Sequence, residues 1–183
     1  MKATGIVRRI DDLGRVVIPK EIRRTLKIRE GDPLEIFTQK DGEIIFKKYS
    51  PIGELGNFAK EYAEALSQVS GHITCIADKD QLIAVSGGSK RELLKKEISE
   101  QLERAIDDRT IVLANKNDTH YIPVLTSEGD NRYNSQLIVP IISEGDAIGA
   151  VIFLSEDSKV KMGEVEEKLA QSAAGFLGKQ MEQ

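Results

Sequence analysis

The sequence is poor in the residues that build disulfides, metal centres and membrane spans. It contains one cysteine, two histidines, no tryptophan and 5% aromatic residues in 183 positions. A single cysteine excludes an internal disulfide and a cluster of thiolate ligands, and His72 and His120 lie far apart in sequence, so we expect no metal site and no cofactor. No apolar run approaches the roughly 20 residues of a membrane helix, and the N-terminus MKATGIVRR lacks the apolar core of a signal peptide. These absences predict a cytoplasmic protein with no membrane partner.

Residues for covalent catalysis are equally scarce. Cys75 lies in the apolar, β-branched run HITCIAD, which predicts a buried strand position, with a redox or nucleophilic role as the alternative. No nucleophile, base and orienting group stand at a recognisable spacing. We therefore expect a protein that is not an enzyme.

Charge is distributed unevenly along the chain. Residues 1–50 contain 12 Lys and Arg against 8 Asp and Glu, a balance of +4, whereas residues 51–183 contain 14 against 22, a balance of −8. Five of the ten arginines lie between Arg8 and Ile28. Such asymmetry indicates a polyanionic partner for the basic part of the chain. The alternative is a solvated charged face that binds nothing.

Residues 1–50 predict short strands around one short helix. GIVRRI and RVVIP are β-rich runs on either side of the turn Asp11–Gly14. Pro19 suits the first position of a helix that has Ile22 and Leu26 on its apolar edge. Two further strands, LEIFTQ and EIIFKKY, are joined by an Asp-Gly hairpin signal. A core this small is marginal alone, so we infer an obligate dimer that mixes strands from two chains.

The stretch SPIGELG interrupts the pattern at Ser50 and marks a short linker, residues 51–56. An apolar seam of heptad spacing follows immediately. It predicts a helix that packs either on the core of its own domain or across a subunit interface, and the two roles are compatible on different faces. The seam positions are Ile52, Leu55, Ala59, Tyr62, Leu66 and Val69.

The remaining sequence predicts a folded α/β tail. We expect strands at HITCIAD, QLIAVSG, TIVLAN, HYIPVLTS, SQLIVPIIS and AIGAVIFLS. One helix is expected over residues 89–109, where Ser89 and Glu92 form a capping box. A last helix begins near Met162 and points Val165, Leu169, Ala173 and Phe176 inward.

The segment Thr4–Phe37 resembles the DNA-binding domain of the AbrB family of bacterial transition-state regulators. The resemblance lies in the motif D-x-L-G-R-V-x-I-P-x-E-x-R, here Asp11–Arg23. It implies a swapped-hairpin β-barrel formed by an intertwined dimer, and double-stranded DNA as partner. It also implies permissive recognition through phosphate contacts and DNA shape. The residues it places on DNA are Arg8, Arg15, Arg23 and Arg24, with Arg9 beside them.

The segment Ser135–Ser158 is similar to a GAF domain, a sensor module with an antiparallel sheet and helices on one face. The fold class is therefore α+β, with an AbrB-type domain at 1–50 and a GAF-like sensor and oligomerisation domain at 57–183. A head of the first kind joined to such a tail resembles sporulation regulators of endospore-forming bacteria. This implies a nucleoid-associated activator and repressor of sporulation genes. We also expect a tetramer assembled through the tail helices at 52–69 and 162–180.

Two questions about the tail stay open in the sequence. Residues 115–134 either line a pocket for an unidentified small molecule, with His120, Tyr121, Arg132 and Tyr133, or form an ordinary surface connection. Related heads also occur in antitoxins, which capture a toxin with an extended acidic tail. Because this tail alternates apolar strands and helices, we expect it to fold independently, which disfavours the antitoxin-like binding module. Some GAF-like domains reduce oxidised methionine with several cysteines, and one cysteine does not suffice.

Overall fold

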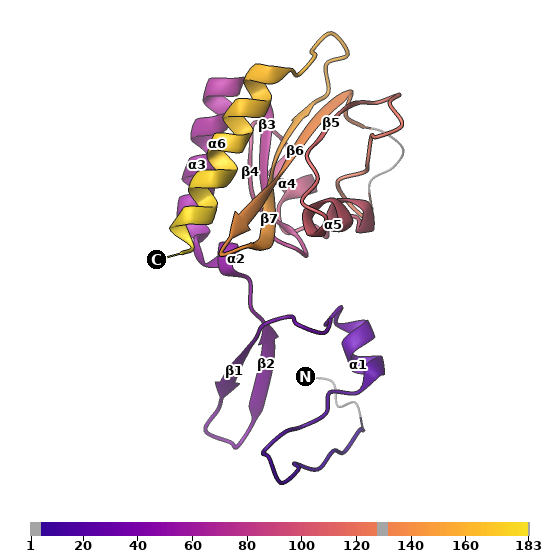
Figure 1. Ribbon diagram of the computed structural model, residues 1–183, viewed down its shortest axis with the longest axis vertical. Helices are drawn as coiled ribbons and strands as arrows, with labels where there is room; N and C mark the ends of the chain where they lie inside the picture. The colour runs from indigo at the N-terminus through magenta and orange to yellow at the C-terminus, as the bar shows by residue number, and fades with distance from the viewer. Residues whose placement is uncertain (1–4, 128–131, 183) are drawn as a thin grey trace. The chain divides into compact units, whose positions relative to one another are not determined.

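The computed structural model describes residues 5–127 and 132–182. The chain forms two compact units, Met1–Tyr49 and Ser50–Gln183, and Figure 1 shows the elements of each. No helix in the described part of the chain is long and apolar enough to cross a membrane. We call the first unit the head and the second the tail.

The head of one copy contains a hairpin and a short helix. β1 (Leu34–Thr38) pairs antiparallel with β2 (Ile44–Lys48). Gly42 adopts φ 79° in the turn between them, as the Asp-Gly signal predicts. α1 spans Lys20–Thr25, and Pro19 is its N-cap rather than its first helical residue.

The two strands expected before α1 are absent from a single copy. Residues 5–18 belong to no helix or strand, so the prediction of strands at GIVRRI and RVVIP is wrong for the isolated chain. A strand needs a neighbour to bond its backbone, and β1 and β2 already bond each other. No strand in the described part of the head pairs with these runs.

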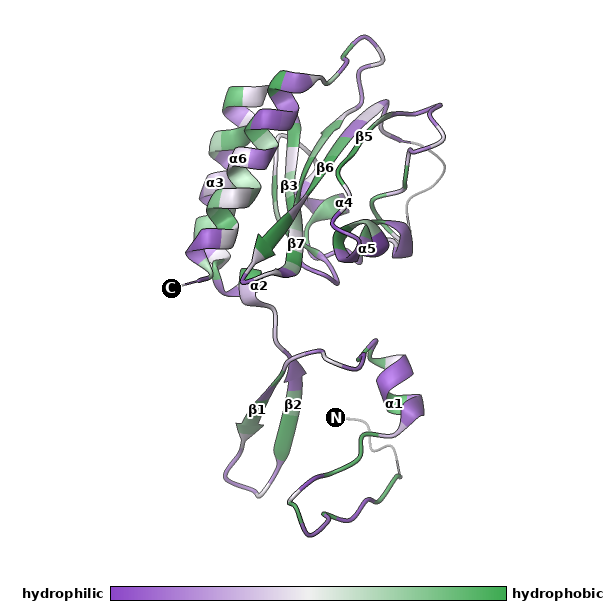
Figure 2. Ribbon diagram, viewed as in Figure 1, coloured by the Kyte–Doolittle hydropathy of each residue, from purple (hydrophilic) through white to green (hydrophobic). Residues whose placement is uncertain are grey.

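Large apolar side chains of the head lie in solvent in one copy. α1 contributes no buried residue, and the green hydrophobic segments of the head in Figure 2 include the stretch before α1. A soluble domain rarely leaves so much apolar surface uncovered. The exposed positions are Ile6, Val7, Ile10, Leu13, Val16, Val17, Leu26, Ile36, Phe37, Ile44 and Phe46.

The tail is built on a five-stranded antiparallel sheet in the order β4-β3-β7-β6-β5. β6 and β7 form its long central hairpin, and the apolar runs predicted as strands supply all five members. Cys75 is buried in β3, as expected. The strands are β3 (Ile73–Ala77), β4 (Leu82–Ser86), β5 (Val112–Asn115), β6 (Ser135–Ser143) and β7 (Asp146–Ser155).

Helices cover both faces of this sheet (Figure 1). The long helices α3 (Gly56–Ser70) and α6 (Glu164–Gln180) lie on one face, as the GAF-like expectation requires, together with α2 (Pro51–Glu54). The short helices α4 (Lys90–Leu93) and α5 (Glu100–Asp107) cover the other face with the loop that follows β5. The sheet therefore separates two apolar cores.

Two predictions for the middle of the tail are wrong. The helix expected over residues 89–109 is divided into α4 and α5, because Lys95 adopts φ 61° and residues 95–96 bond the backbone of Leu82. Ser89 makes no capping hydrogen bond, whereas Ser99 caps α5 by accepting from the Leu102 N–H at 3.0 Å. The strand expected at HYIPVLTS is a loop with one isolated bridge, Ile98 to Leu125.

The heptad seam serves mainly the tail's own core. Ile52 of α2 and Ala59 and Leu66 of α3 are buried in the core on this face of the sheet, whereas Val69 is exposed. The seam is broken at Leu55, where α2 ends and α3 begins.

The residues of α6 that face the core also differ from those predicted. Ala173 faces the core, but Val165 and Phe176 are exposed, so their inward assignment is wrong. The small residues Ala170, Ala173 and Ala174 contact the sheet instead.

Candidate nucleic-acid interface and ligand pocket

The five predicted DNA-binding arginines lie on three neighbouring segments of the head. Arg8 and Arg9 precede the turn at Asp11–Gly14, and Arg15 follows it directly. Arg23 and Arg24 form the basic last turn of α1. Arg8, Arg9, Arg15 and Arg24 are exposed, whereas Arg23 is half-buried.

Asp11 organises the turn that carries Arg15. Its Oδ1 accepts from the backbone N–H groups of Leu13, at 3.0 Å, and Arg15, at 2.7 Å. The backbone N–H of Asp11 donates to the Arg15 carbonyl at 3.0 Å, and the Gly14 N–H donates to the Asp11 carbonyl at 3.1 Å. Gly14 adopts φ 75°, a left-handed conformation that glycine takes without strain. The turn is thus fixed by its own polar groups without a buried core.

The same carboxylate holds the Arg15 guanidinium. Arg15 Nε donates to Asp11 Oδ2 at 2.8 Å. These bonds from the Arg15 backbone and side chain hold the pKa of Asp11 below its usual 3.8. Within the described residues the two Nη groups of Arg15 make no hydrogen bond, so they stay free to fork onto a phosphate or a guanine edge. Arg15 remains a predicted DNA contact. Asp11 was missed in the sequence, although Asp at the start of a turn is the signal for this bonding.

The other four arginines keep their charge uncompensated. No ion pair joins Arg8, Arg9, Arg23 or Arg24 to a carboxylate in the parts of the chain that the structure describes. The Nε atom of Arg23 is buried and has no hydrogen-bond partner there. Guanidinium groups without a carboxylate partner are suited to bind a polyanion.

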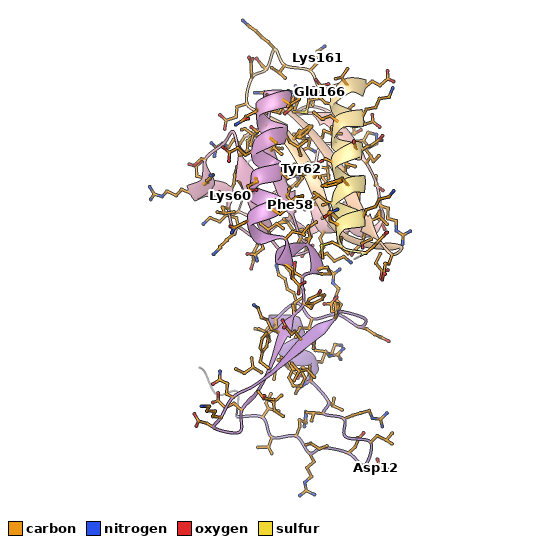
Figure 3. All side chains as sticks on the ribbon, turned by 90° about the vertical axis from the view of Figure 1, so that its left-hand side faces the viewer. Asp12, Phe58, Lys60, Tyr62, Lys161 and Glu166 are labelled. Carbon is orange, nitrogen blue, oxygen red and sulfur yellow. The ribbon has the colours of Figure 1, made fainter. Side chains whose placement is uncertain are left out.

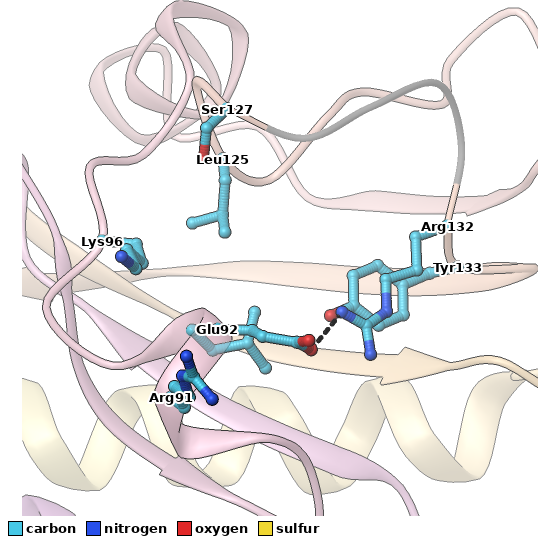
Figure 4. A pocket seen from close by; sticks show the side chains of 8 residues that line it. Arg91, Glu92, Lys96, Leu125, Ser127, Arg132 and Tyr133 are labelled. Atoms are coloured by element: carbon cyan, nitrogen blue, oxygen red, sulfur yellow. Dashed lines mark hydrogen bonds and ion pairs between the residues drawn. The ribbon is translucent and has the colours of Figure 1, made fainter.

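The tail carries a separate hollow of about 340 Å³ on the face covered by α4 and α5 (Figure 4). Arg132 lies at one side, where it donates to Glu92 at 2.5 Å and to Glu156 at 2.8 Å. The hydrogen bond that Arg132 donates to Glu92, together with its positive charge, lowers the pKa of Glu92. The Arg132 guanidinium also lies over the Tyr133 ring, 5.6 Å from its centroid.

The residues expected in the 115–134 pocket do not share one site. Arg132 and Tyr133 line the hollow beside α4. His120 lines another depression, beside α5 and β5. Tyr121 lines neither of them and packs against the core cluster on this face.

Comparison with protein families defines the class. The model "Stage V sporulation protein T C-terminal, transcription factor" matches residues 54–182. A second model, "Antidote-toxin recognition MazE, bacterial antitoxin", matches residues 7–54. The GAF domain of an Acinetobacter phosphoenolpyruvate-protein phosphotransferase covers 69% of this chain and 81% of its own, with a TM-score of 0.55 at 14% identity. The protein is therefore a transcription factor with a GAF-fold tail, and its class is regulatory rather than enzymatic.

Full-length relatives narrow the class to a family. Stage V sporulation protein T of Bacillus subtilis is 60% identical over 183 residues, which is 100% of both chains. The transition state regulatory protein AbrB of the same organism is 41% identical over 109 residues, which is 60% of this chain and 93% of AbrB. The chain belongs to the family of stage V sporulation protein T, and it shares the AbrB relationship that the Asp11–Arg23 motif predicts.

Proposed function

We propose that this protein binds double-stranded DNA through the arginines of its head and thereby activates and represses sporulation genes on the nucleoid in the cytoplasm. The observation that carries the proposal is the group of arginines around the Asp11 turn and on α1. Four of the five are exposed, and four lack any ion pair in the described head. The family relationship supports the same function. The resemblance to the AbrB family implies that phosphate contacts and DNA shape account for most of the recognition.

The exposed apolar surface of the head supports the intertwined dimer. Val7, Ile10 and Val17 are 85%, 67% and 70% exposed in one copy. Pairing the runs GIVRRI and RVVIP with those of a second copy would bury these side chains and add hydrogen bonds to the backbone between residues 5 and 18. A dimer would also double the number of arginines presented to DNA.

The tail supports a tetramer through an aromatic cluster on the outer side of α3 and α6. Phe58, Tyr62 and Phe176 lie with ring centroids 5.4–6.0 Å apart. Phe58 and Phe176 remain 37% and 42% exposed. Figure 3 shows Phe58 and Tyr62 one turn apart on α3. Packing this patch against a second copy would join two head dimers, and linked heads gain affinity without new contacts.

A GAF-fold tail also provides a place for a small-molecule signal. The hollow beside α4 is the candidate, because it combines an apolar floor with charged side chains at its rim. In this proposal the tail both assembles the protein and senses a ligand.

The experiment compares Arg23→Ala in the head with Arg104→Ala in α5, each of which removes one positive charge per chain. Losing a DNA contact costs about 1–3 kcal/mol, so R23A is expected to weaken binding at least about fivefold in gel-shift titrations. The slope of log K against log salt is also expected to become shallower, since fewer counterions are released. R104A is expected to change neither. Equal effects of the two variants would show that only net charge matters and would remove the basis for an arginine face.

The antitoxin alternative receives support only from the head, where the MazE model matches residues 7–54. Its extended acidic tail is missing, because residues 50–182 fold around their own sheet.

A further inference from the structure

The hollow beside α4 has a buried apolar floor. Leu93, Leu125 and Tyr133 line it and are 2%, 7% and 1% exposed. They belong to the core cluster on the sheet face away from α3 and α6. In Figure 4 the Leu125 side chain points into the hollow. Such a floor favours contact with the apolar part of a ligand.

The rim of the hollow carries an excess of positive charge. Arg132 is neutralised by Glu92 and Glu156, so these three groups are already paired. Arg91 and Lys96 are exposed on the opposite side of the hollow (Figure 4). Neither makes an ion pair with any carboxylate of the described chain. Two exposed cations without a direct ion pair, beside an apolar floor, match an anionic group on an apolar body.

We propose that the hollow binds a small organic anion, a carboxylate or phosphate carried on an apolar body. This proposal rests on the sensing role given to the tail above. Arg91 and Lys96 hold the anionic group, and Leu93, Leu125 and Tyr133 contact the apolar body.

The test uses the full chain and four six-carbon probes of matched length: hexanoate, hexyl phosphate, hexan-1-ol and hexylamine. Binding is followed by NMR titration. Saturable binding of hexanoate or hexyl phosphate is expected, and the tighter of the two identifies the anionic group. The alcohol and the amine are expected to bind at least about tenfold more weakly, because they lack the charge-assisted hydrogen bonds.

Variants locate the site. Arg91→Ala and Lys96→Ala are each expected to weaken anion binding about tenfold. Lys161→Ala, which removes a lysine outside the hollow (Figure 3), is expected to leave it unchanged. All three variants should retain the melting temperature and the DNA affinity of the parent protein without probe, so a failure here is distinct from a failure of the DNA-binding proposal. Equal binding of the alcohol, equal weakening by K161A or no saturable anion binding would each overturn the proposal.

Discussion

Asp11 places a negative charge within the most basic segment of the protein. In an electrostatic account based on net charge alone, it opposes DNA. Its three hydrogen bonds to Leu13 and Arg15 suggest the opposite effect, because they fix the turn and orient the guanidinium whose Nη groups remain free. The lowered pKa keeps this carboxylate ionised at neutral pH. The arrangement would be lost only in acid, as the pH falls through that depressed value.

Asp11→Asn separates orientation from net charge. The amide oxygen can still accept from the two backbone N–H groups, but the variant loses the charged acceptor of Arg15 Nε. We expect DNA affinity to fall about threefold to tenfold, because a freely rotating Arg15 pays more conformational entropy on binding. Gel-shift titration at fixed salt measures the change.

Asp12→Asn is the matched control. It removes the same charge one residue away, and Asp12 makes no hydrogen bond or ion pair with the rest of the described chain. Affinity is expected to rise slightly, since one repulsive charge is gone. If D11N and D12N both tighten binding, Asp11 opposes DNA and does not orient Arg15.

At the scale of elements, the apolar pattern of the sequence predicted the strands and helices that depend on local sequence alone. β6 and β7 are long apolar runs around the turn Glu144–Asp146, and the structure pairs them as expected. α6 follows its helical period from Glu164 to Gln180. These elements carry enough apolar residues at one spacing to leave no competing structure.

Where the prediction was wrong, contacts distant in sequence decided the local structure. The apolar stripe from Leu93 to Ala105 has helical spacing, yet residues 95–98 leave the helix to bond the β3–β4 hairpin and the loop at Leu125. In the head, GIVRRI and RVVIP have strand composition but lack a neighbour in their own copy. The DNA-binding arginines remain predictions that rest on a long motif, whereas the hollow was predicted only as a loop region, since its walls come from four separate segments.

Substitution of glycine by alanine is expected to have opposite effects on stability at two positions of α6. An alanine Cβ at Gly178 would lie 2.0 Å from the carbonyl oxygen of Ile142 in β6, so the helix would have to move off the sheet. We expect Gly178→Ala to reduce the free energy of unfolding by about 1–3 kcal/mol, as overpacking typically does. Gly175 is exposed and a Cβ there meets nothing within 4 Å. Gly175→Ala should gain about 0.5–1 kcal/mol from helix propensity.

Denaturant unfolding of the two full-length variants, followed by the helical circular dichroism signal, measures both changes. A Gly178→Ala protein as stable as Gly175→Ala would mean that α6 does not approach β6 this closely.

At the scale of the whole molecule, both units leave apolar surface that one copy does not cover. The head exposes aliphatic side chains before and within its hairpin, and the tail exposes the aromatic cluster of α3 and α6. Ser50 connects the tail to the head sequence and is firmly held, because it donates to buried Asp78 at 3.0 Å and accepts from the Gly53 N–H at 3.2 Å. A fixed starting point for the tail is consistent with self-association at two separate surfaces.

The contributions of these two surfaces to assembly can be distinguished by the double substitution Phe58→Ala/Phe176→Ala. If the aromatic cluster joins dimers, the variant is expected to have half the particle mass of the parent in light scattering, because the head interface is untouched. Burial raises the pKa of Tyr62 between the two rings, and this shift should decrease in the variant as its hydroxyl gains water. DNA affinity should fall about tenfold or more, since two linked head dimers no longer bind one DNA molecule together.

Gln171→Ala, at an exposed position of α6 outside the aromatic cluster, is expected to keep both the mass and the affinity. An unchanged mass in the double variant would place the tetramer contact elsewhere, and a lower mass with unchanged affinity would show that one head dimer accounts for all of the binding.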